Sequence, residues 1–372
     1  MIPVYKPYLP AKSLAYAHDA LDSTWISSQG KYLAAAQEKL QELLGAQYVL
    51  PVNNGTSACH LVAKALSRCW LGDNRKKIIV PDSVYVAAWN AFLFDNEYDL
   101  IAVGTDLDTW NFDLEQLEVA ILLHPDAAVL VVHNIGNIVN VPELQAKFPY
   151  TIFVEDNCEG FMGEYSGVKT GTAALASAIS FFGNKNITSG EGGAVVLTNE
   201  EDFNFIKNIH SQGQSSKRFV HNNLGYNYRM TNVQAAILLG QLEVLPEIME
   251  MKAEVFGRYR AALKDNEDIV MQLSDPTTEH ANWMFGVRVP GRNNYQDAEL
   301  YFKGHGIDVR PMFYPIQTHE YLRNNSSVSW RYCPNADLLN QECLILPSYP
   351  ELTSQEQEHI LTVLKSYAKG QK

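Results

Sequence analysis

Between about residue 50 and residue 200, short β-branched runs alternate with segments of helical periodicity, and this alternation limits the fold more than any other feature. The run Ile78-Ile79-Val80 before Pro81 is typical of a buried strand. Because such runs are apolar throughout, they predict a mostly parallel sheet covered by helices on both faces, an α/β fold. We expect strands at residues 78–80, 100–103, 128–132, 152–154, 178–182 and 194–197, and helices near 58–69, 114–123 and 142–147.

The pattern changes near residue 250. Helical periodicity extends over 232–245 and 247–263 and stops at the polar segment Asn266-Glu267-Asp268. Short strands at 285–289 and 307–309 then mix with helices at 297–303 and 355–367. A chain of 372 residues is longer than one typical core. We therefore predict a large domain over residues 1–250 and a smaller C-terminal α/β domain over residues 251–372.

Composition excludes several classes of partner. The formal net charge of -13 argues against nucleic-acid binding, which usually needs a basic face. The first residues, MIPVYKPYLP, lack the features of a signal peptide, and no apolar run could span a bilayer. We expect a cytoplasmic protein without a membrane partner. The five cysteines have no CxxC or metal-ligand spacing, which favours reduced thiols and no metal site: Cys59, Cys69, Cys158, Cys333 and Cys343.

Several polar groups follow predicted strands, where the crevice of a parallel sheet lies. Asp156 ends one strand, Tyr85 lies in the loop after another, and Gly55-Thr56-Ser57 begins a helix. Lys185 follows the apolar run Ser180-Phe181-Phe182 in a glycine-rich loop. Taken singly, each group has a commoner explanation as a surface lysine, a cap, a packing aromatic or a turn.

Together, the order and spacing of these groups favour a site for pyridoxal 5'-phosphate. That cofactor needs a lysine to hold it covalently, and it needs a carboxylate at its ring nitrogen. It also needs a flat group over the ring and a helix N-terminus for the phosphate. Lys185, Asp156, Tyr85 and the segment from Gly55 supply these groups in turn.

The motifs that carry these residues resemble the DegT/DnrJ/EryC/StrS sugar aminotransferases, which are fold type I pyridoxal-phosphate enzymes. The resemblance covers nearly the whole chain. Within that group, TWISSQG (24–30) and the loop after Ser180 are most similar to 4-aminotransferases of nucleotide-linked 4-keto-6-deoxysugars, of the perosamine and viosamine synthase kind. The resemblance to the family as a whole is strongest in four segments: VNNGTSACHL (52–61), VEDNCEG (154–160), SFFGNKNITSGEGGAVV (180–196) and LGYNYRMTNVQAAILLGQLE (224–243).

The resemblance implies roles position by position. Lys185 would hold the cofactor and act as acid and base, while Asp156 would pair with the ring nitrogen. The remaining cofactor contacts would come from Gly55, Thr56, Ser57 and Ser180 at the phosphate, Tyr85 over the ring, Glu159 near the ring hydroxyl, and Asn227 at the phosphate of a neighbouring subunit. Sugar-nucleotide contacts would come from Trp25, Ser27, Arg310 and Phe313. The implied assembly is a homodimer with shared active sites.

The implied reaction transfers an amino group from L-glutamate to C4 of a nucleotide-linked keto sugar. Lysine at position 185 favours this reaction, because related 3-dehydratases have histidine there. The chain departs from the family at Val84, at Trp89, at 133–136 (His-Asn-Ile-Gly) and between residues 67 and 77. The alternatives are a 3-aminotransferase, an inosose aminotransferase and a non-catalytic cofactor-binding sensor. A nucleotide-binding α/β protein fits less well, because no Gly-rich fingerprint follows the first strand.

Overall fold

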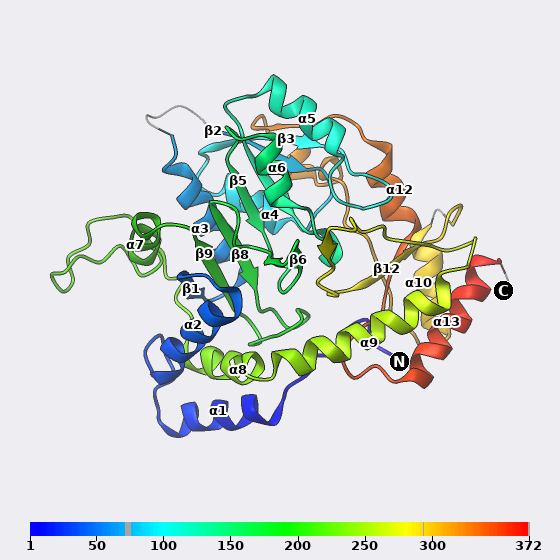
Figure 1. The fold of residues 1–372 in the computed structure, drawn as a ribbon, viewed down its shortest axis with the longest axis horizontal. Helices are drawn as coiled ribbons and strands as arrows, with labels where there is room; N and C mark the ends of the chain where they lie inside the picture. Colours follow the sequence, from blue (N-terminus) through cyan, green and yellow to red (C-terminus); the bar gives the residue numbers. More distant parts are fainter. Residues whose placement is uncertain (71–75, 293, 371–372) are drawn as a thin grey trace.

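An eight-stranded sheet forms the centre of the molecule (Figure 1). The computed structural model describes residues 1–70, 76–292 and 294–370. Residues 71–75 of the divergent stretch at 67–77 therefore lie outside the described residues. Five neighbouring pairs of strands are parallel, and only β9 runs against its neighbours, so the predicted mostly parallel α/β sheet is confirmed. The strand order is β1 (Tyr48–Val52), β9 (Gly193–Leu197), β8 (Ala176–Ser180), β5 (Phe153–Asp156), β4 (Ala128–Val132), β2 (Lys76–Pro81), β3 (Tyr98–Val103) and β14 (Val328–Ser329).

Helices cover both faces of this sheet, as the uninterrupted apolar strands predicted. Along β2, Ile78 and Val80 belong to one buried cluster and Ile79 to the cluster on the other face, because successive strand side chains point in opposite directions. The first face is covered by α3 (Gly55–Ser67), α4 (Ala87–Leu93) and α7 (Glu200–Ile209). The other face is covered by α2 (Lys31–Leu44), α5 (Leu114–Leu123), α6 (Val141–Lys147) and α8 (Asn232–Leu242).

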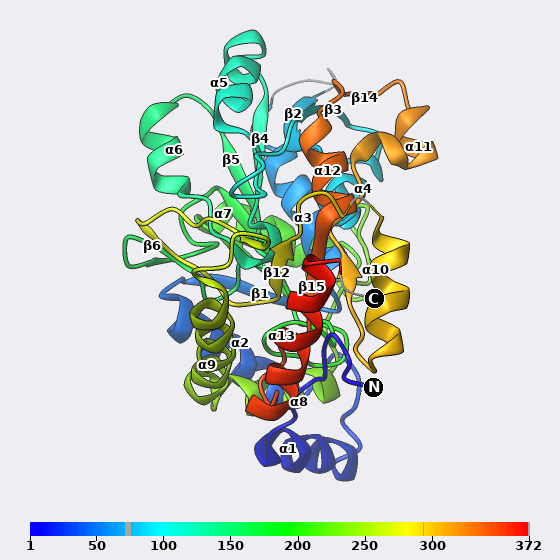
Figure 2. The same cartoon turned by 90° about the vertical axis from the view of Figure 1, so that its right-hand side faces the viewer.

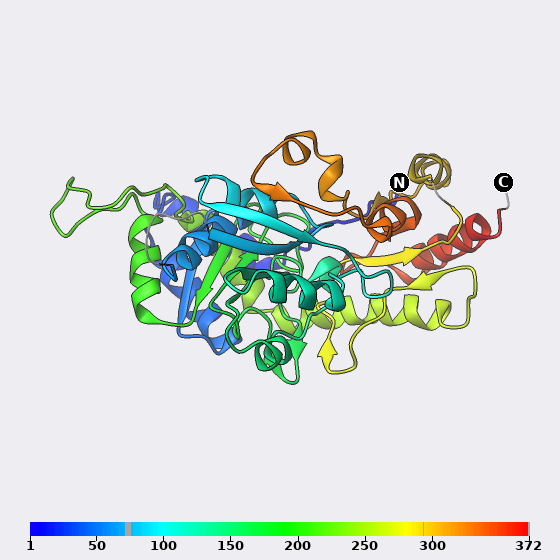
Figure 3. The same cartoon turned by 90° about the horizontal axis from the view of Figure 1, so that it is seen from above.

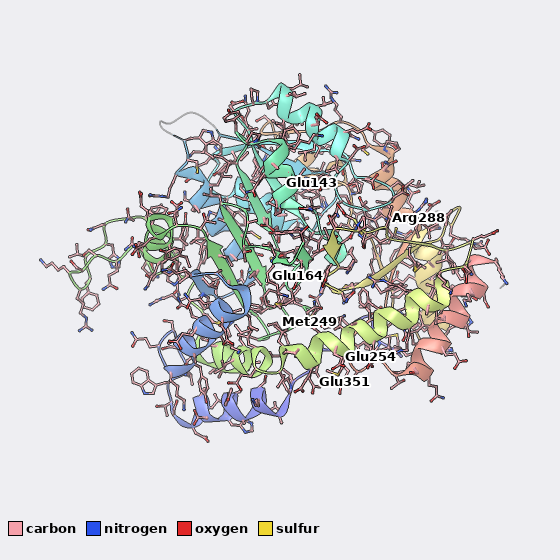
Figure 4. The ribbon with its side chains drawn as sticks, in the orientation of Figure 1. Glu143, Glu164, Met249, Glu254, Arg288 and Glu351 are labelled. Atoms are coloured by element: carbon pink, nitrogen blue, oxygen red, sulfur yellow. The ribbon has the colours of Figure 1, made fainter. Side chains whose placement is uncertain are left out.

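A second, smaller sheet lies beside the first in the C-terminal part of the chain. It consists of β10 (Val270–Met271), β12 (Phe285–Arg288), β15 (Cys343–Leu346) and β13 (Arg310–Pro311). Its core includes side chains from α9 (Leu245–Leu263), α10 (Tyr295–Gly304) and α13 (Ser354–Ala368). Arg288, labelled in Figure 4, makes a 3.0 Å ion pair with Glu342 at the end of β12. The remaining elements are α1 (Ala11–Asp22), η1 (Asn134–Gly136), β6 (Glu164–Tyr165), β7 (Val168–Lys169), β11 (Thr278–Glu279), η2 (Ile316–Thr318), α11 (Glu320–Arg323) and α12 (Pro334–Glu342).

The division at residue 250 stays a prediction. Helix α9 runs through that position without interruption, from Met249 to Glu254 in Figure 4 and beyond. In addition, β14 comes from the C-terminal part of the chain but pairs with β3 of the large sheet, and Figure 2 shows it beside β2 and β3. The chain therefore returns to the large sheet after residue 250.

Several predicted strands differ in their limits from the structure, and two of the differences have a clear physical reason. The strand expected at 307–309 instead occupies Arg310–Pro311, and Ile307 forms only an isolated bridge with Ile2. Ile307 and Val309 are apolar because they are buried in the smaller core, which mimics a strand pattern. The strand expected at 178–182 ends at Ser180, because pairing with β9 stops where Ser180 meets Gly193.

Helices α1 and α8 pack closely against one another, and Gly240 of α8 lies at their point of contact. A Cβ placed on Gly240 of α8 would lie 2.4 Å from the Ser13 backbone nitrogen of α1. The Ser13 hydroxyl also donates a 2.9 Å hydrogen bond to the Ile237 carbonyl. Helix α1 leads directly into the loop that contains Trp25, so this contact fixes where that loop begins.

Two alanine substitutions test this packing. Gly240→Ala should lower the free energy of unfolding by about 1–3 kcal/mol, because its methyl group would force α1 away from α8. Gly257→Ala is the matched control, since its Cβ would meet nothing within 4 Å in the middle of α9. The control should gain about 0.5–1 kcal/mol from helix propensity. Urea unfolding followed by circular dichroism measures both changes, and equal effects would contradict the close contact.

Candidate active site

The carboxyl ends of the parallel strands meet at one edge of the large sheet. Pairing sets Ser180 of β8 and Val52 of β1 level with Gly193, and Asp156 of β5 level with Val132 of β4. A cavity of about 440 Å³ opens at this edge, between the large sheet and residues of the smaller one. This size is within the range of small-molecule sites.

One end of the cavity is the N-terminus of α3. Asn54 caps the helix by accepting a 2.8 Å hydrogen bond from the Ser57 N–H, and Gly55 and Thr56 line the cavity. A Cβ on Gly55 would lie 2.7 Å from the Ser180 Cβ, so only glycine permits this approach. The helix end and the Ser180 hydroxyl thus form a small cradle with partial positive charge, which fits a phosphate group.

Lys185 extends into the same cavity and lies over an indole ring. Its Nζ is 3.9 Å from the centroid of the Trp283 ring, within the range of a cation–π contact. The loop that carries Lys185 is fixed on both sides. Its carbonyl accepts a 2.6 Å hydrogen bond from the Tyr5 hydroxyl, and the Asn184 carbonyl accepts one of 2.8 Å from the Trp283 Nε1.

A buried lysine is hydrogen-bonded to the Trp283 backbone. Lys252 of α9 is fully buried, and its Nζ donates a 2.7 Å hydrogen bond to the Trp283 carbonyl and another to the Ser348 carbonyl. Burial lowers the pKa of Lys252 well below its ordinary value. The long helix α9 therefore links the smaller sheet to the residue under Lys185.

Two carboxylates line the cavity near Lys185. Asp156 Oδ1 accepts a 3.0 Å hydrogen bond from the Cys158 N–H, and Glu159 Oε2 accepts one of 2.8 Å from the Ile135 N–H. Burial raises the pKa of Glu159 to about 7, against the opposing effects of Lys185 and the Ile135 N–H. At neutral pH, Glu159 can therefore hold or release a proton inside the cavity.

The Ile135 backbone has an unusual conformation for a β-branched residue. Its φ is +60°, which costs of order 1–3 kcal/mol and needs support from the surrounding structure. The support comes from its neighbour, because Asn134 Nδ2 donates to the carbonyls of Ser83 at 2.9 Å and Trp110 at 2.8 Å. The divergent 133–136 segment thus aims a backbone N–H at Glu159.

The outer wall of the cavity is aromatic and basic. Tyr85 and Phe313 face one another with ring centroids 6.1 Å apart, and Tyr85 is 60% exposed. Arg310 of β13 and Phe313 line the cavity from the C-terminal part of the chain. Val84 and Trp89 are buried, and the Trp89 Nε1 donates a 2.9 Å hydrogen bond to the Pro81 carbonyl.

The structure brings together nine of the thirteen residues suggested by the sequence. The cavity is lined by Gly55, Thr56, Tyr85, Asp156, Glu159, Ser180, Lys185, Arg310 and Phe313. Ser57 is buried at the α3 cap and does not line it. Asn227 does not line it either. It lies at the base of the segment between α7 and α8 that extends away from the body in Figures 1 and 3, where its carbonyl accepts a 3.4 Å hydrogen bond from Asn53 Nδ2.

The other two suggested residues lie beside a separate helix. Trp25 is 58% exposed, and its carbonyl accepts a 2.7 Å hydrogen bond from Asn232 Nδ2 at the start of α8. The Ser27 carbonyl accepts a 2.6 Å hydrogen bond from the Asn232 N–H. Neither residue contributes to the cavity formed by this chain.

Several residues that line or support the site carry no recognisable sequence pattern. Trp283 is 98 positions from Lys185 and Tyr5 is 180 positions from it. Neither residue lies in a motif that indicates a site. Cys59 and Cys158 also line the cavity, although their spacing suggested nothing. Asn54 comes directly before the helix that begins at Gly55 in the motif VNNGTSACHL, and asparagine at that position is typical of an N-cap.

Comparison with known proteins gives a consistent result. A family model described as the DegT/DnrJ/EryC1/StrS aminotransferase family matches residues 7–365. The chain is 33% identical to a GDP-perosamine synthase of Escherichia coli O157:H7 over 373 residues, covering 98% of each chain.

Solved structures agree in fold. An aminotransferase of Helicobacter pylori involved in pseudoaminic acid biosynthesis superposes with a TM-score of 0.88 at 25% identity, covering 98% of this chain and 99% of the other. A GDP-4-keto-6-deoxy-D-mannose-3-dehydratase of E. coli, with bound hydrated pyridoxal phosphate, gives a TM-score of 0.88 at 22% identity, covering 98% of this chain and 99% of the other. With its fold, its cavity and its matched residues in agreement, the chain belongs to the DegT/DnrJ/EryC1/StrS aminotransferase family.

Proposed function

We propose that this enzyme transfers an amino group from L-glutamate to C4 of a nucleotide-linked 4-keto-6-deoxysugar. The product would be a 4-amino-4,6-dideoxysugar of the perosamine or viosamine type. The observation that carries this proposal is the meeting of Lys185, Asp156 and the α3 N-terminus in one cavity. The full-length similarity to a GDP-perosamine synthase supports a GDP-linked sugar as the first substrate to test.

Membership of the family makes pyridoxal phosphate the cofactor, and the cavity fits it. The cradle of Gly55, Thr56 and Ser180 would bind the phosphate. The Asp156 carboxylate would keep the ring nitrogen protonated, and Tyr85 would cover the ring. When bound, the cofactor supplies an electron sink and carries the amino group between the two substrates.

The protein's own groups would manage protons and orientation. The Lys185 Nζ would hold the cofactor and, when free, take up and return the proton of each half-reaction. Trp283 keeps that nitrogen in place and shields one side of it from water. Glu159, whose pKa burial raises to about 7, would hold a proton for a hydrogen bond to the ring hydroxyl. Arg310 and Phe313 would contact the sugar nucleotide.

The residues that do not line the cavity support a shared site. Asn227 lies at the base of the segment between α7 and α8, and the apolar side chains of Phe219 and Leu224 on that segment are 78% and 88% exposed. Trp25 is exposed as well. We propose a homodimer in which Asn227, and the loop of Trp25 and Ser27, reach the cavity of the neighbouring subunit.

The first test is product formation with Lys185→Ala as the comparison. Wild type supplied with pyridoxal phosphate, L-glutamate and GDP-4-keto-6-deoxymannose should form an amino sugar, with nitrogen at C4 by nuclear magnetic resonance. The variant should lose roughly 10³-fold or more in rate, because the lysine acts in each proton transfer. Lys207→Ala, a change in α7, is the control that should retain activity. Amination at C3 would instead favour the 3-aminotransferase alternative.

Hybrid dimers test the shared site. Lys185→Ala and Asn227→Ala should each be weakly active alone. Mixed in equal amounts after reversible dissociation, half of the dimers are hybrids with one intact site, so activity should recover to about a quarter of wild type. If the mixture shows only the average of the two variants, Asn227 acts within its own subunit or not at all.

The raised pKa of Glu159 predicts a pH-dependent stability of the cofactor-free protein. Between about pH 4.5 and pH 7, Glu159 keeps a proton in the folded state that it releases in the unfolded chain. Its contribution to the free energy of unfolding is therefore present below pH 4.5 and is lost as the pH rises through 7. Glu159→Gln should therefore be more stable than wild type above pH 7, and the difference should shrink toward pH 4.5. Urea unfolding across this range measures it, with exposed Glu267→Gln as the control. A difference that is constant with pH would contradict the raised pKa.

A further inference from the structure

Two cysteines and a carboxylate meet on the wall of the cavity. The Sγ atoms of Cys59 and Cys158 and a carboxylate oxygen of Asp156 all lie within 4.8 Å of one another. Cys59 comes from α3, whereas Asp156 and Cys158 come from the end of β5 and the loop after it. In the part of the chain that the structure describes, no other three His, Cys, Asp or Glu side chains are grouped in this way.

The two thiols lie beside one another, with their Sγ atoms no more than 4.8 Å apart. The pKa of the Cys158 thiol is raised well above its ordinary value, first by its hydrogen bond to Cys59 and then by burial. Cys59 is 3% exposed, so access to both sulfurs runs through the cavity that they line. The remaining cysteines are free and lie elsewhere: Cys69, Cys333 and Cys343.

Two thiolates and one carboxylate are a ligand set for a borderline-soft divalent cation such as Zn²⁺. Tetrahedral zinc with Zn–S bonds of about 2.3 Å needs sulfur atoms about 3.8 Å apart. The present separations of at most 4.8 Å are therefore within about 1 Å of that geometry. The fourth position would face the cavity and could take water.

We propose that the cofactor-free protein binds one Zn²⁺ ion through Cys59, Cys158 and Asp156, and that this ion and pyridoxal phosphate exclude each other. Both ligands need the Asp156 carboxylate, and a divalent cation beside it would repel a protonated ring nitrogen. The two thiols lose their protons to solvent when they bind the metal. The metal site rests on this cluster alone, and only the exclusion rests on the proposed function.

Titration of the full-length, cofactor-free protein with zinc chloride against a chromogenic chelator tests the site. Wild type should bind one ion per chain, and Cys59→Ala and Cys158→Ala should each bind it roughly tenfold or more weakly. Cys69→Ala, at an exposed position, is the matched control and should bind like wild type. Circular dichroism checks that each variant is folded. Equal zinc affinity in all four proteins, or no stoichiometric binding to wild type, would overturn the site.

Competition tests the exclusion separately. Adding pyridoxal phosphate to the zinc-loaded wild type should release the ion to the chelator, and zinc should slow the appearance of the absorbance of the protein-bound cofactor. Simultaneous binding of both would overturn the exclusion. If pyridoxal phosphate does not bind even without zinc, the proposed function fails, while the chelator titration still decides the metal site.

Discussion

The alignment of strand ends at one edge of the large sheet is the constraint on which the site depends. Parallel strands place their carboxyl ends at the same edge, and the reversed strand β9 begins there. Residues that follow different strands therefore meet, although up to 130 positions separate Gly55 from Lys185. No single loop could hold a helix N-terminus, a carboxylate and a lysine around one cavity.

Backbone strain and the burial of an ionisable group destabilise the protein locally at this edge, and the surrounding structure offsets both. The left-handed backbone of Ile135 persists because Asn134 is bonded to the loops after β2 and β3. Burial raises the pKa of the Glu159 carboxyl to about 7, so this group can stay in the cavity in its protonated form. Strain and desolvation of this kind concentrate at functional sites, because the surrounding structure can support them.

The C-terminal part of the chain completes the site rather than merely adjoining it. It supplies Arg310, Phe313 and Trp283, and Lys252 of α9 holds the Trp283 carbonyl from a fully buried position. Met284 and Ile345 also line the cavity from this side. A shift of α9 would therefore move Trp283, whose ring contacts the Lys185 Nζ.

The sequence by itself determined that the central sheet is mostly parallel and covered by helices, and it determined the family, because both depend on local patterns. Apolar runs identify buried strands, and the motifs around Gly55, Asp156 and Lys185 each lie at a strand end. It could not determine the strand at Arg310–Pro311, since burial of Ile307 and Val309 gives the same apolar pattern as strand pairing. Nor could it show Trp283 under Lys185, or Cys59 beside Cys158, which are 99 positions apart. Such contacts exist only because chain packing, not spacing along the chain, decides which side chains share a cavity.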